Sequence, residues 1–225
     1  MWLILAPMNR RQLLAALGRA TVGVTGLYVL GGCGSEGDGP SPLDAGAPSD
    51  AGLCRPTTRD VLGPFHREGA PSRAAIASAS EAGTRIALGG IVLGDDCSTP
   101  LVGAALDIWQ ADASGQYHEP TEPGEPFRLR GQVASAADGT WAIDTIRPGN
   151  YRNGPGWRPA HLHFIVSAPG HRTLTTQLYF ADDPYLPPND SCTGCGSDDP
   201  ARIIPLSAGG GGGLVGDFRI VLARA

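Results

Sequence analysis

Short apolar or alternating runs, separated by glycine and proline, recur through most of this chain and limit the folds it can adopt. The 225 residues include 33 glycines and 20 prolines, which interrupt long regular elements. Helical periodicity is nearly absent beyond residue 54. We therefore expect an all-β domain, an antiparallel β-sandwich with long loops. The runs predict strands at 85–94, 104–111, 130–136, 140–145, 160–167, 172–180 and 217–224.

Composition divides the chain into three segments. Residues 1–33 have the character of an export signal, and residues 34–53 form a flexible linker, rich in Gly, Ser, Pro, Asp and Ala. Residues 54–225, about 170 in number, match the size of a single domain. All 17 basic residues are arginine, and beyond the leader 14 arginines stand against 22 acidic residues. This negative balance argues against a nucleic-acid partner.

The leader resembles a twin-arginine signal that ends in a lipobox. Arg10 and Arg11 precede an apolar stretch that runs to Leu30, and Leu30-Gly-Gly-Cys33 follows. Cys33 would be the lipidated first residue of an exported lipoprotein, periplasmic or held at the cell envelope. The lipid at Cys33 would be its only contact with a membrane.

Two alternatives in this region stay open. The apolar run 13–30 is marginally long enough to be an ordinary membrane-anchoring helix. The seven residues before Met8 add nothing that a signal peptide needs, so Met8 competes with Met1 as the true start.

Four cysteines follow the leader, and an even number in an oxidising compartment favours disulfides. Four thiols allow three pairings, of which we favour Cys54 with Cys97 and Cys192 with Cys195. The Cys-x-x-Cys pair could instead bind zinc or act in redox chemistry. Zinc would need a second pair nearby, and no strand-to-helix pattern suggests a thioredoxin-like fold.

Two histidines on one expected strand provide half of a metal site. His161 and His163 stand two residues apart in an alternating run, and side chains at that spacing share one face of a strand. Tyr151 precedes them by ten residues, and Tyr117 follows another apolar strand in a Gly-containing turn. We predict that Tyr117, Tyr151, His161 and His163 bind one metal ion.

The charges of these groups favour Fe(3+). Phenolate is a hard anion that prefers ferric to ferrous iron, and a trivalent cation would keep both tyrosines deprotonated below their usual pKa of about 10. With two phenolates, two neutral imidazoles and one hydroxide the net charge is zero, which a partly buried site favours. A chelating ligand that displaces the hydroxide and one tyrosinate can give its two protons to these two bases, and the sum stays zero.

The same residues belong to a pattern that resembles the intradiol ring-cleavage dioxygenases, the non-haem iron(III) family that includes protocatechuate and catechol dioxygenases. The match covers roughly residues 54 to 224 in the family's order, which is far more specific than a single His-x-His pair. It implies the β-sandwich of that family. It also implies that O2 cleaves a catechol-type ring between its two hydroxyl-bearing carbons, to give a cis,cis-muconate-type product. The matching stretches are 62–65, 107–110 with Tyr117, 148–151, 157–163, 176–180 and 217–222.

The resemblance also implies individual roles. Tyr151 and His163 would be axial ligands, Tyr117 and His161 equatorial ligands, and Tyr151 the tyrosine that the substrate displaces. Arg158 and Gln177 match positions that line the pocket, where a guanidinium can stabilise negative charge developing on the ring. We expect Trp109 and Trp157 to wall the cavity.

The remaining histidines and tyrosines have simpler interpretations. We expect surface or core positions for His66, His118 and His171, and assign no role to Tyr179 and Tyr185.

Three other classes of function fit the sequence less well. A cupin-type site needs a carboxylate soon after its His-x-His pair, but the first acid after His163 is Asp182. A ferrous extradiol enzyme needs two histidines and a carboxylate on one face, and no acid accompanies the His161 strand. The main alternative is a non-catalytic, lipid-anchored β-sandwich that binds a small molecule or a protein.

Which catechol is the substrate stays open at this point. A carboxylated ring would need a cation at its far side, and the candidates are Arg55, Arg59, Arg73 and Arg152. The sequence also leaves open an oligomer, in which a second subunit could complete the pocket.

Overall fold

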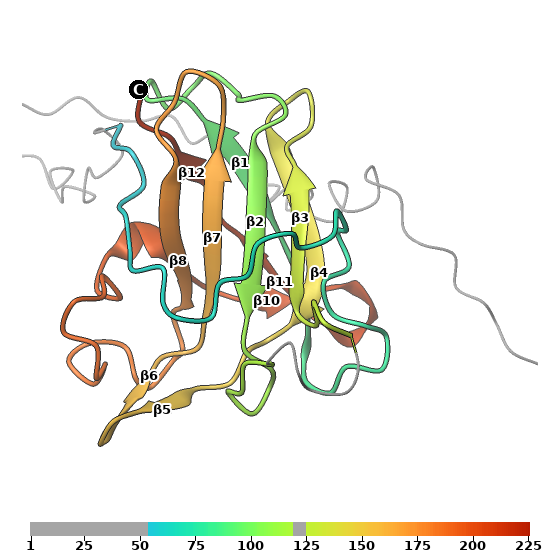
Figure 1. Cartoon of the computed structure of the whole chain (residues 1–225), viewed down its shortest axis with the longest axis vertical. Helices are drawn as coiled ribbons and strands as arrows, with labels where there is room; N and C mark the ends of the chain where they lie inside the picture. Colours follow the sequence, from blue (N-terminus) through green and yellow to red (C-terminus); the bar gives the residue numbers. More distant parts are fainter. Residues whose placement is uncertain (1–53, 119–124) are drawn as a thin grey trace, which may run out of the picture. The chain divides into compact units, whose positions relative to one another are not determined.

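A computed structural model describes residues 54–118 and 125–225 of the chain (Figure 1). The predicted leader and linker, with Cys33 and both possible starts, lie outside the described residues. In the described part of the chain, no helix is long and apolar enough to cross a membrane.

The first sheet has five strands in the order β3-β2-β7-β8-β9. Its first four strands pair antiparallel, whereas β9 joins β8 in parallel. The strands are β2 (Ala105–Gln110), β3 (Arg130–Ala134), β7 (His161–Ser167), β8 (Leu174–Phe180) and β9 (Ile203–Ile204).

The second sheet is built around β1, which pairs antiparallel with β4 and parallel with both β11 and β12. After β9 in the first sheet, the chain crosses to the second sheet. There β11 and β12 run in the same direction as β1 and pair with it in parallel. At Gly90 a Cβ atom would lie 2.0 Å from the carbonyl oxygen of Phe218, so only glycine permits this close approach. The strands are β1 (Arg85–Leu93), β4 (Thr140–Ile146), β10 (Ser207–Ala208), β11 (Leu214–Asp217) and β12 (Ile220–Val221).

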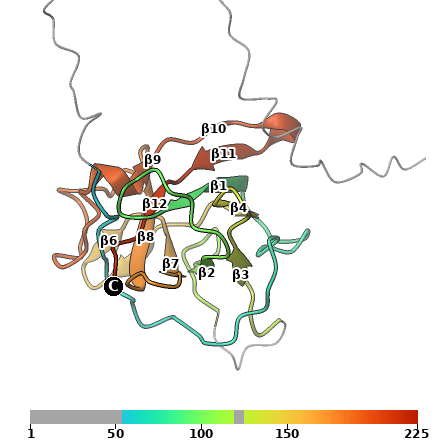
Figure 2. The ribbon, with the colours of Figure 1, turned by 90° about the horizontal axis from the view of Figure 1, so that it is seen from above.

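The core lies between the two sheets, which Figure 2 shows as two layers. Phe164 of β7 meets Trp141 of β4 and Phe218, each at 5.6 Å between ring centroids. Alternate residues of the strands supply the rest of the cluster, among them Leu106 and Leu88. The predicted β-sandwich is therefore confirmed, with parallel pairs added to a mainly antiparallel structure.

Six of the seven predicted strands form within a few residues of their expected bounds. The seventh prediction, a single strand over 217–224, was wrong. β11 ends at Asp217, and β12 covers only Ile220–Val221 of that run. The sequence also gave no sign of the hairpin β5 (Tyr151–Asn153) and β6 (Gly156–Arg158), which projects from one end of the sandwich (Figure 1). Two short 3₁₀ turns, Pro200–Arg202 and Gly210–Gly212, complete the described elements.

Two disulfides hold the loops, and both are the pairs that the sequence favoured. Cys54 is bonded to Cys97, and Cys192 to Cys195. The first joins the beginning of the described domain to the loop after β1. The second closes a short loop between β8 and β9.

Residues 54–66 form a strap across the outer face of the first sheet, seen as the cyan segment in Figure 1. The backbone N–H of Asp60 donates to the carbonyl of Thr175 in β8. Further along, Gly63 lies against His163 of β7, and His66 contacts Asp107 of β2. The strap thus crosses three strands and covers the face opposite the core.

Candidate metal centre

His161 and His163 lie under the strap, at the start of β7. Each is 2% exposed, and the alternate residues Leu162 and Phe164 belong to the core cluster. Trp109 faces His163 across β2 and β7 and stacks on its ring, with 4.7 Å between the centroids. Strand alternation therefore turns both imidazoles to the same buried side, as their spacing predicted.

Tyr117 ends a tight turn that follows β2. The Asp112 carboxylate accepts hydrogen bonds from the backbone N–H groups of Ser114 (2.8 Å) and Gln116 (3.0 Å). Burial opposes the ionisation of Asp112, but these hydrogen bonds together outweigh it and hold the pKa of the carboxyl below its ordinary value. The turn is thus fixed from within by a charged side chain.

The same turn packs against the segment that contains the second tyrosine. The N–H of Gly149 donates to the carbonyl of Asp112 at 2.8 Å. A Cβ atom on Gly115, whose φ is +83°, would lie 2.2 Å from the carbonyl oxygen of Asn150. Tyr117 and Tyr151 are therefore brought to one place by backbone contacts between their two loops.

The donor atoms of three predicted ligands converge on one point. The hydroxyl oxygen of Tyr117 lies 3.1 Å from Nε2 of His163 and 3.5 Å from Nε2 of His161. Two donors that bind one ion at about 2.1 Å stand about 3.0 Å apart at a right angle and about 3.6 Å apart at 120°. The observed spacings fit a shared ion.

Tyr151 completes the group from the β5–β6 hairpin. Its ring centroid lies 5.9 Å from that of Tyr117, edge to face, and 5.6 Å from that of His161. Tyr151 pairs across the hairpin with Arg158, whose positive charge acts on its hydroxyl. Tyr151 is only half-buried, which makes it the most accessible of the four.

Without a metal ion, these four groups are held neutral. Burial raises the pKa of Tyr117, and the neighbouring Tyr151 adds to the effect; burial raises the pKa of Tyr151 as well. Burial and the positive charge of Arg158 lower the pKa of His161 to about 3, and burial with His161 lowers that of His163. A bound cation would lower the pKa of both tyrosines, because it stabilises phenolate.

The protonation of the imidazoles suits metal binding. Nδ1 of His161 lies 2.7 Å from the carbonyl oxygen of Pro159, so it is the nitrogen that donates, and Nε2 keeps its lone pair. Nε2 of His163 faces the Tyr117 hydroxyl. Two neutral imidazole nitrogens and two phenol oxygens form a donor set that fits ferric iron.

The described residues contain no carboxylate-based metal site as an alternative to the tyrosines and histidines. Among the residues that the structure describes, no group of three or more His, Cys, Asp or Glu side chains is placed to hold a metal ion. The cupin and extradiol arrangements therefore have no counterpart in these residues.

Arg158 and Gln177 lie beside the four ligands and contact each other. Nη2 of Arg158 donates to Oε1 of Gln177 (3.0 Å) and to the Tyr179 hydroxyl (3.1 Å). Gln177 pairs with His163 across β7 and β8, and its Nε2 donates to the carbonyl of Val61 in the strap. The buried guanidinium of Arg158 thus lies next to the four predicted ligands, and on one side it contacts the neutral side chains of Gln177 and Tyr179.

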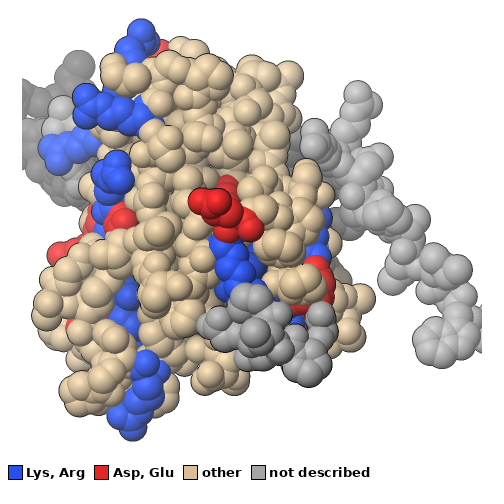
Figure 3. All heavy atoms as spheres, in the orientation of Figure 1, with Lys and Arg blue, Asp and Glu red and all other residues tan. Residues whose placement is uncertain are grey.

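The strap closes the site from above. Phe65 stacks on Tyr117, with 4.1 Å between parallel rings. Gly63 has a φ of +71°, and a Cβ atom there would lie 3.3 Å from Cε1 of His163. Val61 and Leu62 are 40% and 41% exposed. On this side the molecule is uncharged over most of its area, with arginines gathered along the left edge (Figure 3).

The other predicted pocket residues differ in their placement. Trp109 is 1% exposed and contacts the site through His163. Trp157 instead lies between the ring of Tyr185 (5.5 Å) and the guanidinium of Arg152 (4.9 Å).

The four arginines proposed for a carboxylated substrate do not gather at the ligands. Arg59 donates to the carbonyl of Thr173, Arg73 to that of Arg130, and Arg152 to that of Pro155. Arg55 is exposed at the beginning of the strap.

Sequence reasoning missed two groups near the site. Tyr179, left without a role, is fully buried and contacts both Arg158 and Gln177. His66 lies 4.7 Å from the Trp109 ring and 3.1 Å from the Asp107 carboxylate. Tyr179 stands in the stretch 176–180 that matched the family pattern, which was the available signal. His118 contacts the Asp112 carboxylate, and His171 contacts the carbonyl of Pro169.

Curated proteins similar to this chain include enzymes named as dioxygenases. The profile of the family described as "Dioxygenase" matches residues 61–198. The chain is 35% identical over 188 residues to chlorocatechol 1,2-dioxygenase of Rhodococcus opacus, covering 74% of this chain and 72% of that one. It is 33% identical over 157 residues to catechol 1,2-dioxygenase 2 of Acinetobacter lwoffii, covering 62% of this chain but 57% of the relative.

Solved structures with the same fold agree. The dioxygenase domain of a dioxygenase carbohydrate-binding protein fusion from Streptomyces sp. SirexAA-E is 35% identical, with a TM-score of 0.64, and the match covers 76% of this chain and 100% of that one. For 3-chlorocatechol 1,2-dioxygenase of Rhodococcus opacus 1CP the identity is 26%, the TM-score 0.68, and the coverage 76% and 74%.

Proposed function

The chain belongs to the intradiol ring-cleavage dioxygenase family, and we propose that it binds Fe(3+) through Tyr117, Tyr151, His161 and His163 and cleaves a catechol between its two hydroxyl-bearing carbons. The observation that supports this most is the approach of the Tyr117 oxygen to both histidine Nε2 atoms. Bound ferric iron would supply a Lewis acid that activates the catechol toward O2.

Tyr151 is the proton acceptor in this proposal. It is the least buried of the four ligands, and the positive charge of Arg158 favours its phenolate form. Tyr151, once released from the metal, would accept one substrate proton as phenolate, and Arg158 would keep its side chain in the pocket. A hydroxide brought with the metal would supply the second base.

Arg158 and Gln177 orient the substrate and stabilise the negative charge that develops on its ring. The guanidinium is buried, 4% exposed, so its charge acts through a medium of low polarity. Trp109 and Phe65 pack against His163 and Tyr117 and exclude water from the ligands.

The substrate is a catechol without a carboxylate. The relatives in the comparisons are named for catechol, chlorocatechol, hydroxyquinol and 6-chlorohydroxyquinol. The three candidate arginines with assigned contacts bond elsewhere, which supports a ring that needs no second cation.

The protein is an exported lipoprotein anchored through Cys33. Its two disulfides support an oxidising compartment. Labelling with radioactive palmitate tests the anchor, because a Cys33→Ala variant should lose the label. Equal labelling of both proteins would overturn the assignment.

A visible spectrum with iron analysis tests the proposed function. Purified protein should contain near one iron per chain and show a tyrosinate-to-iron band. That band should shift when catechol is added without oxygen, and protocatechuate should shift it less. A protein that stays colourless and iron-free after reconstitution would refute the enzyme and favour a binding module.

A further inference from the structure

Arg158 has one carboxylate partner among the described residues, and it comes from a loop remote in sequence. Asp190 lies with Oδ1 at 2.9 Å from Nε of Arg158, and the two side chains are 2% and 4% exposed. The N–H of Nε does not point directly enough at the oxygen to form a hydrogen bond. The contact is therefore an ion pair whose geometry depends on where the loop holds Asp190.

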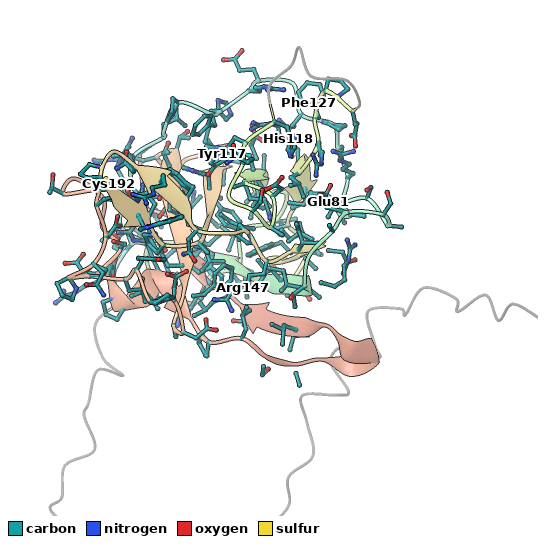
Figure 4. All side chains as sticks on the ribbon, turned by 90° about the horizontal axis from the view of Figure 1, so that it is seen from below. Glu81, Tyr117, His118, Phe127, Arg147 and Cys192 are labelled. Carbon is teal, nitrogen blue, oxygen red and sulfur yellow. A yellow bond between two sulfur atoms is a disulfide. The ribbon has the colours of Figure 1, made fainter. Side chains whose placement is uncertain are left out.

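That loop is fastened on several sides. Oδ1 of Asp190 accepts from the N–H of Cys192 (2.9 Å), and Oδ2 accepts from the Ser197 hydroxyl (2.5 Å). The N–H of Ser191 donates to the carbonyl of Trp157, next to Arg158 in β6. In Figure 4, which looks from the hairpin end, the Cys192 loop lies beside that hairpin.

The Cys192–Cys195 disulfide crosslinks the segment that follows Asp190, between the two residues, Cys192 and Ser197, that bond its carboxylate. The sequence from 190 to 197 is Asp-Ser-Cys-Thr-Gly-Cys-Gly-Ser, and small residues with two glycines have little conformational preference of their own. Without the crosslink, the segment that bonds the Asp190 carboxylate would keep its hydrogen bonds but lose its one covalent constraint. The disulfide thus lies where it can control a side chain beside the site.

We propose that Asp190 is a positioning residue for Arg158, and that the loop closed by the Cys192–Cys195 disulfide holds it in place. This inference rests on the proposed function, since it gives Arg158 its orientation for catechol cleavage. It also makes full turnover depend on an oxidised loop, as an exported enzyme would have.

The physical reason is the cost of a buried, unpaired cation. If Asp190 is lost, the Arg158 charge has no compensation in its surroundings. Asp60, which is linked to Arg158 through the Tyr179 hydroxyl, already pairs with Arg202. The guanidinium would then turn toward Asp60 or toward solvent, away from the position of the substrate ring.

A double-mutant cycle tests whether Asp190 acts through Arg158. Asp190→Asn should lower kcat at least about tenfold with little change in KM, because a small displacement of a charge-stabilising group mainly affects the transition state. In an Arg158→Gln background the same substitution should have no further effect. Equal losses in both backgrounds would mean that Asp190 only supports folding, and would overturn the proposal.

The two disulfides offer a matched pair of variants. Cys192→Ser with Cys195→Ser should lower kcat while the melting temperature changes little, since the crosslink spans three residues. Cys54→Ser with Cys97→Ser should instead lower the melting temperature and leave kcat unchanged, since that crosslink spans 43 residues and is not part of the loop that holds Asp190. Wild-type kcat in an iron-loaded Cys192→Ser, Cys195→Ser protein would refute the role of the loop.

A readout without turnover separates this inference from the proposed function. In metal-free protein, NMR should show the Arg158 guanidinium protons exchanging slowly with water, and faster in Asp190→Asn and in the Cys192→Ser, Cys195→Ser protein. Unchanged exchange would refute the positioning contact even if the enzyme is active. Slow exchange that depends on the loop, in a protein that neither binds iron nor cleaves catechol, would refute the proposed function alone.

Discussion

Two tyrosines in one site differ in ways that suit them to different tasks. Tyr117 is 9% exposed, stacks on Phe65, and approaches both histidine nitrogens. Tyr151 is half-buried and pairs with Arg158 across the β5–β6 hairpin. The first environment would suit a permanent ligand of the proposed metal ion, and the second a ligand that leaves.

Removing each hydroxyl should therefore have distinct effects. Tyr117→Phe should lower the iron bound per chain and weaken the tyrosinate-to-iron colour, because one oxygen of the shared site is lost. Tyr151→Phe should retain most of the iron but slow substrate deprotonation by about a hundredfold or more, the usual contribution of a general base. Iron analysis and stopped-flow absorbance measure the two effects. Wild-type turnover in Tyr151→Phe would contradict its role as proton acceptor.

The sequence predicted the residues whose signal is local. His161 and His163 are recognisable by their spacing on one strand, and the structure brings them together with both tyrosines. Tyr179 and Asp190 were not found, because their importance arises from contacts with Arg158 that no short spacing encodes. Burial and partner identity appear only once distant segments meet.

One polar contact joins the two sheets through the interior. Gln110 of β2 donates to the carbonyl of Ile146 in β4 at 2.9 Å, and its Oε1 accepts from the Thr145 hydroxyl at 2.8 Å. Both side chains are buried, so every hydrogen bond in this contact is shielded from water.

Breaking this contact should reduce the free energy of unfolding. Thr145→Val leaves Oε1 of Gln110 without its donor and should cost about 1–3 kcal/mol. Thr140→Val is the matched control, because its hydroxyl bonds Asp138 at the exposed surface, and it should cost under about 1 kcal/mol. Urea unfolding of the metal-free proteins measures both. Equal losses would show that water replaces the buried donor.

The turn from Asp112 to Tyr117 should give the protein a measurable acid sensitivity. The pKa of Asp112 lies below its ordinary 3.8 in the folded state, so the stabilisation is complete above that value and is lost as the pH falls through the folded pKa. Asp112→Asn should destabilise the protein by about 1 kcal/mol or less near neutral pH, since the group is partly exposed. The difference in free energy of unfolding between wild type and Asp112→Asn should disappear in acid. Unfolding curves recorded from pH 7 to pH 2 test this, and a constant gap would exclude the charge as its source.

Strands with clear alternation were predictable, and strands defined by pairing were not. In β4 and β7 the alternate residues face the core, so the pattern alone locates them. The run 217–224 looks continuous, but Phe218 turns into the core and its backbone meets Gly90, which divides the strand. The β5–β6 hairpin is too short to show a pattern and is held by its neighbours instead.

At the scale of the whole molecule, the site depends on a segment that belongs to neither sheet. The strap covers the ligands through Gly63 and Phe65, and it is attached along its length. Cys54 is bonded to Cys97, the N–H of Thr57 donates to the carbonyl of Val221, and Asp60 pairs with the buried Arg202. A disulfide, a backbone hydrogen bond and an ion pair therefore all hold the strap over the proposed metal site.

Because these attachments are separate, losing one should reduce stability without opening the site. The Cys54–Cys97 crosslink spans 43 residues, and the entropy it removes from the unfolded chain corresponds to about 4 kcal/mol. Cys54→Ser with Cys97→Ser should lower the free energy of unfolding by up to about that amount. Iron content should stay at the wild-type level, because Asp60 and Arg202 still hold the strap over β8. Loss of iron from this variant at temperatures where it remains folded would mean that the disulfide, and not the buried ion pair, keeps the strap on the ligands.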